Sequence, residues 1–147
     1  MSTEKMTAEE QEARTKRIAE LNDAVRTNIG SPFNSGRVMV TQGVHGLDED
    51  ERRKLLTAVR NGWDRGDDPY GEHDFGCVFR TVRRDKGVTV VSWTSEDLPH
   101  LEGGDARRRA FFKIDYYAKG DDMHGSEDPS DPAKTDRVLT IMLGEEY

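Results

Sequence analysis

The chain has 147 residues, of which 33% are hydrophobic and 35% are charged, and its formal net charge is −7. This length suits one domain with a single core and is too short for two domains of ordinary size. No apolar run approaches the roughly 20 residues that cross a bilayer, no signal-peptide apolar region follows Met1, and the single cysteine, Cys77, excludes an intrachain disulfide. We therefore expect one acidic domain with a cytoplasmic location.

The N-terminal part of the sequence predicts a helix. Thr7 and Glu10 have the spacing of a capping box, and the segment that follows is helical in its pattern as far as Asn28. Apolar residues recur at helical spacing only in the C-terminal half of this segment. We therefore expect residues 1–17 to form a partly solvated helical arm and residues 18–147 to form the domain itself.

A strand and a second helix are predicted next. Residues 37–41 form a short run rich in β-branched side chains, which is typical of a strand. Asp48 and Glu51 repeat the capping-box spacing, and the apolar residues after them recur at helical spacing as far as Trp63. The second helix should therefore place one apolar face on the core.

The rest of the chain predicts four more strands. Apolar and polar side chains alternate over residues 73–80, as in a strand with one buried face. A polar turn that ends at Gly87 joins this strand to an apolar run over residues 88–94, which predicts a hairpin. Residues 109–118 alternate aromatic and polar side chains, and residues 137–143 form another β-rich run.

These elements favour an α+β fold, because the strands and helices do not alternate in regular βαβ units. We expect a sheet of about five strands, mainly antiparallel, with two helices packed on one face. Cys77 falls within an apolar alternation, so we expect a small buried side chain there.

Two polar motifs are more specific than packing requires. They are residues 68–76 (DPYGEHDFG) and residues 125–132 (GSEDPSDP). The acidity gathers around them, with five acidic residues and one basic residue over positions 64–74, and six acidic residues and one basic residue over positions 121–136. Such faces repel nucleic acid and attract a cation or a basic groove on a protein.

Several segments, taken together, resemble the signature of one bacterial family. They are Gly71–Gly76 (GEHDFG), Phe112–Tyr117 (FKIDYY), Gly125–Pro129 (GSEDP), the pair Asp131-Pro132, and Arg137–Leu143 (RVLTIML). They look like domain-of-unknown-function family 3768 (DUF3768), with a similarity that spans Ile18–Tyr147. The family name carries no activity. The resemblance implies small proteins encoded on plasmids, integrated elements and phages, a context that favours inhibition of a host defence system.

The leading hypothesis is a non-enzymatic binding protein of a mobile genetic element. Its acidic surfaces would occupy a basic site on a host protein, such as a nucleic-acid-binding defence complex, as an anti-CRISPR or anti-restriction protein does. We expect no cofactor, no direct contact with nucleic acid and no membrane contact. Tyr70 and Tyr117 would add an aromatic surface. The carboxylates expected to bind the partner are Asp67, Asp68, Glu72, Asp74, Asp121, Asp122, Glu127, Asp128 and Asp131.

Two alternative functions stay open. His73, Asp115 and His124 are residue types that bind divalent metals, which suggests a metal-dependent hydrolase, although their spacing matches no compact metal motif and no catalytic nucleophile stands out. A small scaffold or regulator that forms a homodimer through its N-terminal helix is the other alternative. The second polar motif also has a structural explanation, because Asp131 followed by Pro132 is typical of the start of a short helical turn.

Overall fold

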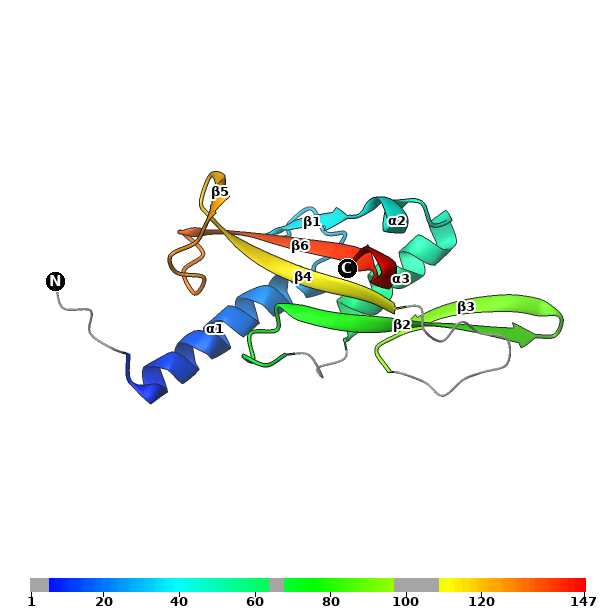
Figure 1. Cartoon of the computed structure of the whole chain (residues 1–147), viewed down its shortest axis with the longest axis horizontal. Helices are drawn as coiled ribbons and strands as arrows, with labels where there is room; N and C mark the ends of the chain where they lie inside the picture. The colour runs from blue at the N-terminus through cyan, green and yellow to red at the C-terminus, as the bar shows by residue number, and fades with distance from the viewer. Residues whose placement is uncertain (1–5, 64–67, 97–108) are drawn as a thin grey trace.

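The computed structural model describes residues 6–63, 68–96 and 109–147. It contains a curled mixed sheet with its two longer helices on one face (Figure 1). None of the described helices is long and apolar enough to cross a membrane. In chain order the elements are α1 (Ala8–Thr27), β1 (Arg37–Val40), α2 (Gln42–His45), α3 (Glu49–Asn61), β2 (Phe75–Asp85), β3 (Val88–Thr94), β4 (Arg109–Ala118), β5 (Asp121–Gly125), β6 (Thr135–Leu143) and the 3-10 turn η2 (Gly144–Glu146).

The strands form one sheet in the order β1-β6-β4-β2-β3, and β5 pairs with the far end of β4. β1 runs parallel to β6, and the other pairings are antiparallel. The predicted α+β fold is confirmed. The described residues contain one strand and one helix more than predicted, because β5 and α2 are short, and β5 (DDMHG) has neither β-branched residues nor an apolar alternation.

The two longer helices begin where their capping boxes predict. Thr7 Oγ1 accepts a hydrogen bond from Glu10 N at 3.1 Å, and Asp48 Oδ1 accepts one from Glu51 N at 2.9 Å. The buried side chains of α1 begin at Ile18, and its first turns are exposed. The apolar contact of α1 is therefore confined to its C-terminal half, as the thin stripe predicts.

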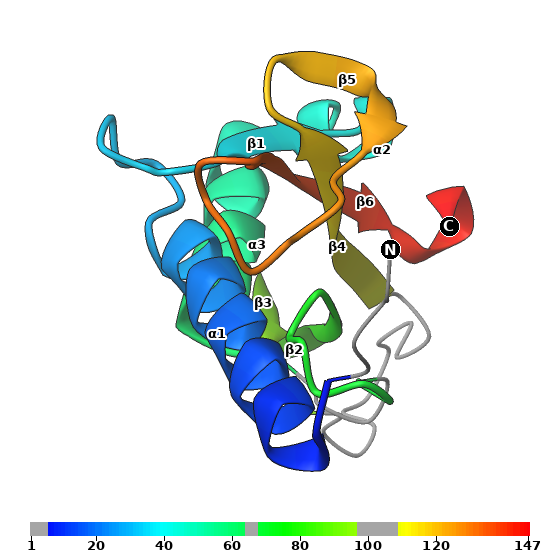
Figure 2. The same cartoon turned by 90° about the vertical axis from the view of Figure 1, so that its left-hand side faces the viewer.

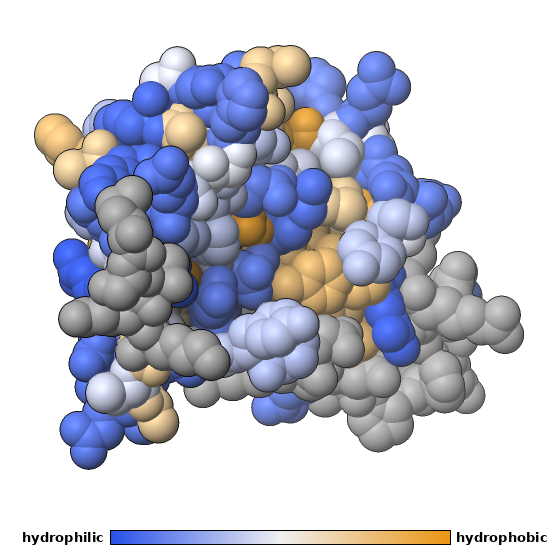
Figure 3. All heavy atoms as spheres, turned by 60° about the vertical axis from the view of Figure 1, so that its left-hand side comes forward, coloured by the Kyte–Doolittle hydropathy of each residue, from blue (hydrophilic) through white to orange (hydrophobic). Residues whose placement is uncertain are grey.

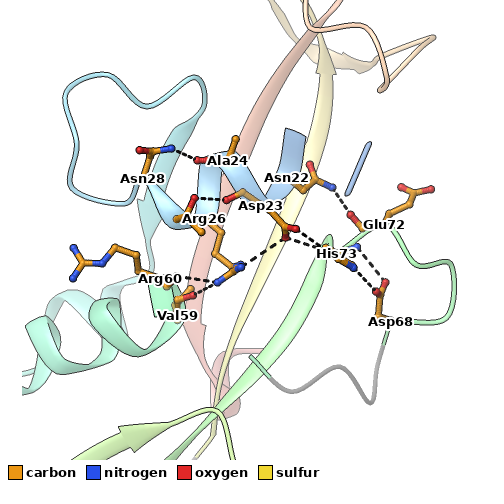
Figure 4. A network of polar contacts seen from close by, with 11 residues as sticks. Asn22, Asp23, Ala24, Arg26, Asn28, Val59, Arg60, Asp68, Glu72 and His73 are labelled. Carbon is orange, nitrogen blue, oxygen red and sulfur yellow. Dashed lines mark hydrogen bonds and ion pairs between the residues drawn. The ribbon is translucent and has the colours of Figure 1, made fainter. Parts of the chain in front are cut away.

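A buried arginine joins α1 to the end of α3. The Arg26 guanidinium Nη1 donates to the main-chain oxygens of Val59 at 3.0 Å and Arg60 at 2.9 Å (Figure 4). The last turn of a helix leaves such carbonyls without intrahelical donors, and a cation there is favourable. Asp23 of α1 lies 3.7 Å from the same guanidinium. One helix thus caps the other.

The predicted hairpin between β2 and β3 is confirmed. Asp85 pairs with Val88, and the two residues between them, Lys86 and Gly87, have φ angles of 51° and 79°. Two consecutive positive φ angles define the tight turn whose twist matches antiparallel strands. The sequence signal for this turn was the glycine at its second position.

The core lies between the helices and one face of the sheet. Val25 of α1, Leu55 of α3, Val78 of β2 and Phe112 of β4 belong to one cluster and have no exposed surface. Cys77 lies opposite Phe111, so its side chain is on the other face of the sheet, and it is buried as predicted. The core face of β2 is therefore the one that carries Val78.

Candidate functional site

The two polar motifs meet at the middle of β4. β2 pairs with β4 as far as Lys113, and β5 pairs only with its last residues. Between these pairings, Ile114 N donates to Asp74 O at 2.7 Å and Ser126 N donates to Tyr116 O at 3.0 Å. The loops that carry the two polar motifs also lie beside α1 (Figure 2). Two segments far apart in the sequence are thus brought together on one strand.

Asn22 of α1 is the centre of a buried polar network at this junction. Its side chain has no exposed surface. Its Nδ2 donates to the main-chain oxygen of Glu72 at 2.9 Å (Figure 4) and to the hydroxyl of Tyr116 at 2.8 Å. Its Oδ1 accepts from Arg137 Nε at 2.8 Å, and the Tyr116 hydroxyl donates to Glu72 Oε1 at 2.9 Å. One asparagine therefore connects the first polar motif, β4 and β6 to α1.

Arg137 connects the second polar motif to the same network. The residue is 5% exposed, and its Nη2 donates to the main-chain oxygen of Pro129. Its guanidinium carbon lies 5.3 Å from the centre of the Tyr116 ring, which is a cation–π contact. Burial lowers the pKa of Arg137 and raises the pKa of Tyr116. Tyr116 therefore keeps its proton, as its bond to Glu72 requires.

His73 precedes β2, so the prediction that it lies in a strand is wrong. Its φ is 59°, and Gly71 before it has a φ of 71°. Its backbone N–H donates to Asp68 Oδ1 at 3.3 Å instead of to a neighbouring strand. Its Nδ1 lies 3.0 Å from both carboxylate oxygens of Asp23 (Figure 4). Its ring centre lies 5.0 Å from that of Trp63. A non-glycine residue in this conformation persists only where its surroundings hold it.

A hollow of about 600 Å³ opens beside this loop. Gly71 and His73 border it on one side, and Gln11, Thr15 and Ala19 of α1 border it on the other. The exposed first half of α1 thus forms a wall next to the first polar motif.

The three residues predicted for a metal site do not come together. His73 pairs with α1, as described above. Asp115 lies on β4 and pairs with Lys113 Nζ at 3.1 Å, and His124 lies on β5 and its Nδ1 is 2.7 Å from Asp121 Oδ2. Among the described residues, no three histidine, cysteine, aspartate or glutamate side chains are grouped so that they could hold a metal ion.

Two of the three described carboxylates of the first acidic stretch are engaged within the protein. The Asp68 side chain is 8% exposed and accepts from the backbone of His73. Glu72 accepts from the Tyr116 hydroxyl. Asp67, which we also predicted to bind a partner, lies outside the described residues. Asp68 and Glu72 therefore have structural roles that the charge pattern did not indicate.

The second motif is a pair of turns. Asp128 accepts from Ser130 N at 3.1 Å and from Ser130 Oγ at 2.5 Å, and it lies 3.5 Å from Arg14 of α1. The bond from Ser130 is the main reason that the pKa of Asp128 is lowered. Asp131 Oδ1 accepts from Ala133 N at 2.9 Å. Lys134 N donates to Asp131 O at 3.1 Å, so the turn predicted before the last strand is present as a single hydrogen-bonded turn and does not extend into a helix.

Asp74 differs from the other carboxylates of the first motif. It is half-buried, its carboxylate accepts a hydrogen bond from its own backbone N–H, and within the part of the chain that the structure describes no cation pairs with it. Burial, and then the negative charge of Glu72, raise its pKa. Asp68 and Asp115 add smaller effects of the same sign. Asp74 is therefore a carboxylate whose charge no cation of the described residues compensates.

The second acidic stretch presents its free carboxylates on β5 and in the loop after it. Asp122 and Glu127 are exposed, and Met123 between them is 82% exposed. Hydrophilic side chains dominate the side of the molecule from which β5 projects (Figure 3). Tyr70 is 78% exposed in the first loop, and Tyr117 is half-buried where β4 meets β5. Of the described carboxylates that were predicted to bind a partner, the exposed ones, Asp122 and Glu127, thus lie on β5 and in the loop after it.

Replacing Asp74 by asparagine should raise the melting temperature at neutral pH. Since the folded-state pKa of Asp74 is raised, its ionised form costs stability above that pKa, and the cost disappears as the pH falls through it. The gain of the variant should therefore shrink on acidification, as thermal unfolding over a pH series would measure. Asp136→Asn is the control of opposite sign, because bonds from Gly120 N and Lys119 lower the pKa of Asp136. A lower melting temperature for Asp74→Asn at neutral pH would contradict this account.

Sequence reasoning missed Asn22 and Arg137 as parts of the site. A signal for Asn22 was present, since it lies one turn after Ile18 and one turn before Arg26, on the face of α1 that is buried. A polar side chain on a buried helical face requires partners. Arg137 carried no such signal, because arginine at the start of a strand is ordinarily solvated.

The fold and the junction define a small α+β protein in which two acidic loops are held against one helix by a buried polar network. The chain belongs to the family described as protein of unknown function (DUF3768), whose model matches residues 40–146. The family resemblance of the sequence is thereby confirmed. The matched segment contains both polar motifs and begins after α1. No curated protein and no solved structure matches the chain.

Proposed function

We propose that this protein is a non-enzymatic binding protein whose acidic side, formed by Asp74, Asp122 and Glu127, occupies a basic site on a partner protein. Asp74 is the observation that carries the proposal. It is a half-buried carboxylate at the junction of the two polar motifs, and its charge has no cationic partner among the described residues. A lysine or arginine from a partner would supply that missing charge.

The exposed carboxylates around β5 support the same proposal. Asp122 and Glu127 extend the negative charge from the junction onto the surface, and Met123 offers an apolar contact among them. Carboxylates at the rim of an interface act mainly on the rate of association and on specificity. Asp74, nearer the junction, would contribute more to the lifetime of the complex.

The partner that we propose is a host defence protein with a basic, nucleic-acid-binding site. The support is the acidity of this side, which suits a surface built for phosphates, and the mobile-element context that the family resemblance implies. In this proposal the protein competes with nucleic acid for the partner and is an inhibitor of the anti-CRISPR or anti-restriction type.

The test is a pull-down from a host lysate with wild-type protein and single variants. We expect a specific partner whose capture falls with rising salt, and we expect both Asp122→Lys and Asp74→Asn to reduce that capture by about tenfold, the loss of one charged contact. Asp74→Asn is the sharper variant, because it should stabilise the fold while it weakens binding. Asp85→Lys, in the exposed β2–β3 turn, is the matched control.

A partner captured equally by wild type, Asp122→Lys and Asp74→Asn would contradict the proposal. So would a capture that Asp85→Lys abolishes and the other two variants leave unchanged. Nucleic acid that contains the partner's binding sequence should also displace this protein from the partner, and failure to do so would remove the proposed mode of inhibition.

A further inference from the structure

A groove of about 660 Å³ lies between α3 and the edge strand β3, and the proposed function makes no use of it. Side chains from one face of α3 form one wall, and the end of β3 with the residue after it forms the other. The lining includes Arg53, Lys54 and Asn61 from α3, and Ser92, Trp93 and Ser95 from the opposite wall.

Trp93 in this groove has an unusual polar atom. The residue is 7% exposed and belongs to the core cluster beneath α3. Its indole Nε1 is buried, and none of the described residues supplies it with a hydrogen-bond acceptor. Most buried N–H groups in proteins are paired, because a buried donor without an acceptor loses its bonds to water and gains none in return. Trp93 therefore offers a donor to any acceptor atom that enters the space beside it.

The charged side chains that line the groove have a net positive charge. Arg53 Nη2 lies 2.7 Å from one oxygen of Asp50, and Lys54 Nζ lies 3.2 Å from the other. Lys54 Nζ also donates to Val91 O at 3.0 Å, which holds the ammonium across the groove from α3 to β3. Two cations share one carboxylate, so a unit of positive charge remains in a protein whose net charge is −7.

The neutral lining side chains add to the excess of donors. Asn61 supplies amide hydrogens, and Ser95 supplies a hydroxyl group that can turn to donate. Asp50 is the one carboxylate among the described lining residues. A ligand that fits this set must therefore bring acceptors and negative charge.

We propose that the α3–β3 groove binds a small ligand through an anionic oxygen, a carboxylate or a phosphate, which accepts from Trp93 Nε1 and pairs with Lys54 and Arg53. Arg53 and Lys54 are long, partly exposed side chains that can move to pair with an anion that enters the groove. The hydrogen bond from Lys54 Nζ to Val91 O holds the ammonium group in the groove, where the anionic oxygen of the ligand would bind.

The test is a two-dimensional proton–nitrogen NMR titration of the full chain with sodium phosphate and, separately, with sodium acetate at constant ionic strength. The protein has two tryptophans, and the Trp93→Phe variant assigns the indole signal by its loss. We expect a saturable shift of the Trp93 indole signal. A shift with phosphate alone identifies a phosphate ligand, a shift with acetate alone identifies a carboxylate, and a shift with both supports the shared chemistry.

Two charge variants decide whether the shift reports this site. Lys54→Gln should weaken binding about tenfold, the loss of one charge-assisted contact, whereas Arg83→Gln, an exposed position on β2, should leave it unchanged. The backbone amide spectrum checks that each variant is folded. The absence of a saturable indole shift with either anion would overturn the inference, and so would equal affinities of Lys54→Gln and wild type. Neither result affects the proposed function, because the groove and the acidic side share no residue.

Discussion

Replacing Asn22 by alanine should lower the free energy of unfolding by about 3 kcal/mol. The side chain has no exposed surface, and its amide group bonds to Glu72, Tyr116 and Arg137. Alanine leaves the main-chain oxygen of Glu72 and the Nε of the buried Arg137 without their partner. Breaking a buried network at one member costs more than one ordinary hydrogen bond, because the remaining groups stay desolvated.

Chemical denaturation of the wild type and of two variants would measure this effect. Asn28→Ala is the matched control, since Asn28 is the exposed C-cap residue of the same helix and its Nδ2 donates to Ala24 O at 2.6 Å (Figure 4). We expect the control to lose about 1 kcal/mol or less. Equal losses for the two variants would mean that the network contributes nothing beyond a helix-end hydrogen bond.

Replacing Gly76 by alanine should cost about 2 kcal/mol, although the change adds a single methyl group. A Cβ at this position would lie 2.5 Å from Cε1 of Phe112 and 2.9 Å from Cε3 of Trp63. Phe112 has no exposed surface and Trp63 is 8% exposed, so neither ring has room to withdraw. The last glycine of the first polar motif is therefore needed for packing.

Gly125→Ala is the control for this prediction, because Gly125 opens the second polar motif. A Cβ there would approach Tyr116 O at 3.7 Å, an ordinary contact distance. We expect a change within about 0.5 kcal/mol in the same denaturation experiment. If Gly76→Ala were as mild as Gly125→Ala, the β2–β4 contact must be looser than these distances indicate.

Much of the fold could be predicted because its signals are local. The capping boxes at Thr7 and Asp48 mark the starts of two helices, and Gly87 marks the hairpin. β5 was missed because an acidic, exposed strand has no apolar face to produce an alternation. The parallel pairing of β1 with β6 joins two strands that are far apart in the sequence, and no periodic pattern of residues predicts such a pairing.

The site was less predictable because side-chain bonds between distant segments form it. The alternation from His73 onward predicted a strand. In the structure the backbone N–H of His73 donates to the carboxylate of Asp68, and His73 has a positive φ that a strand does not allow. The sequence predicted that Glu72 and Asp128 bind a partner. It could not show that their carboxylates accept hydrogen bonds from Tyr116 and Ser130 of the same chain. Charge counts measure composition, whereas the availability of a carboxylate depends on its neighbours in space.

The position of α1 has a consequence for how relatives of this protein are recognised. The family model begins at residue 40, whereas Val25 of the core and Asn22 of the network both come from α1. The matched segment by itself would leave one side of its core open to water and Arg137 short of an acceptor. The recognised domain is therefore smaller than the unit that folds. Any relative with the same junction must contribute an equivalent helix from the sequence upstream of the matched segment.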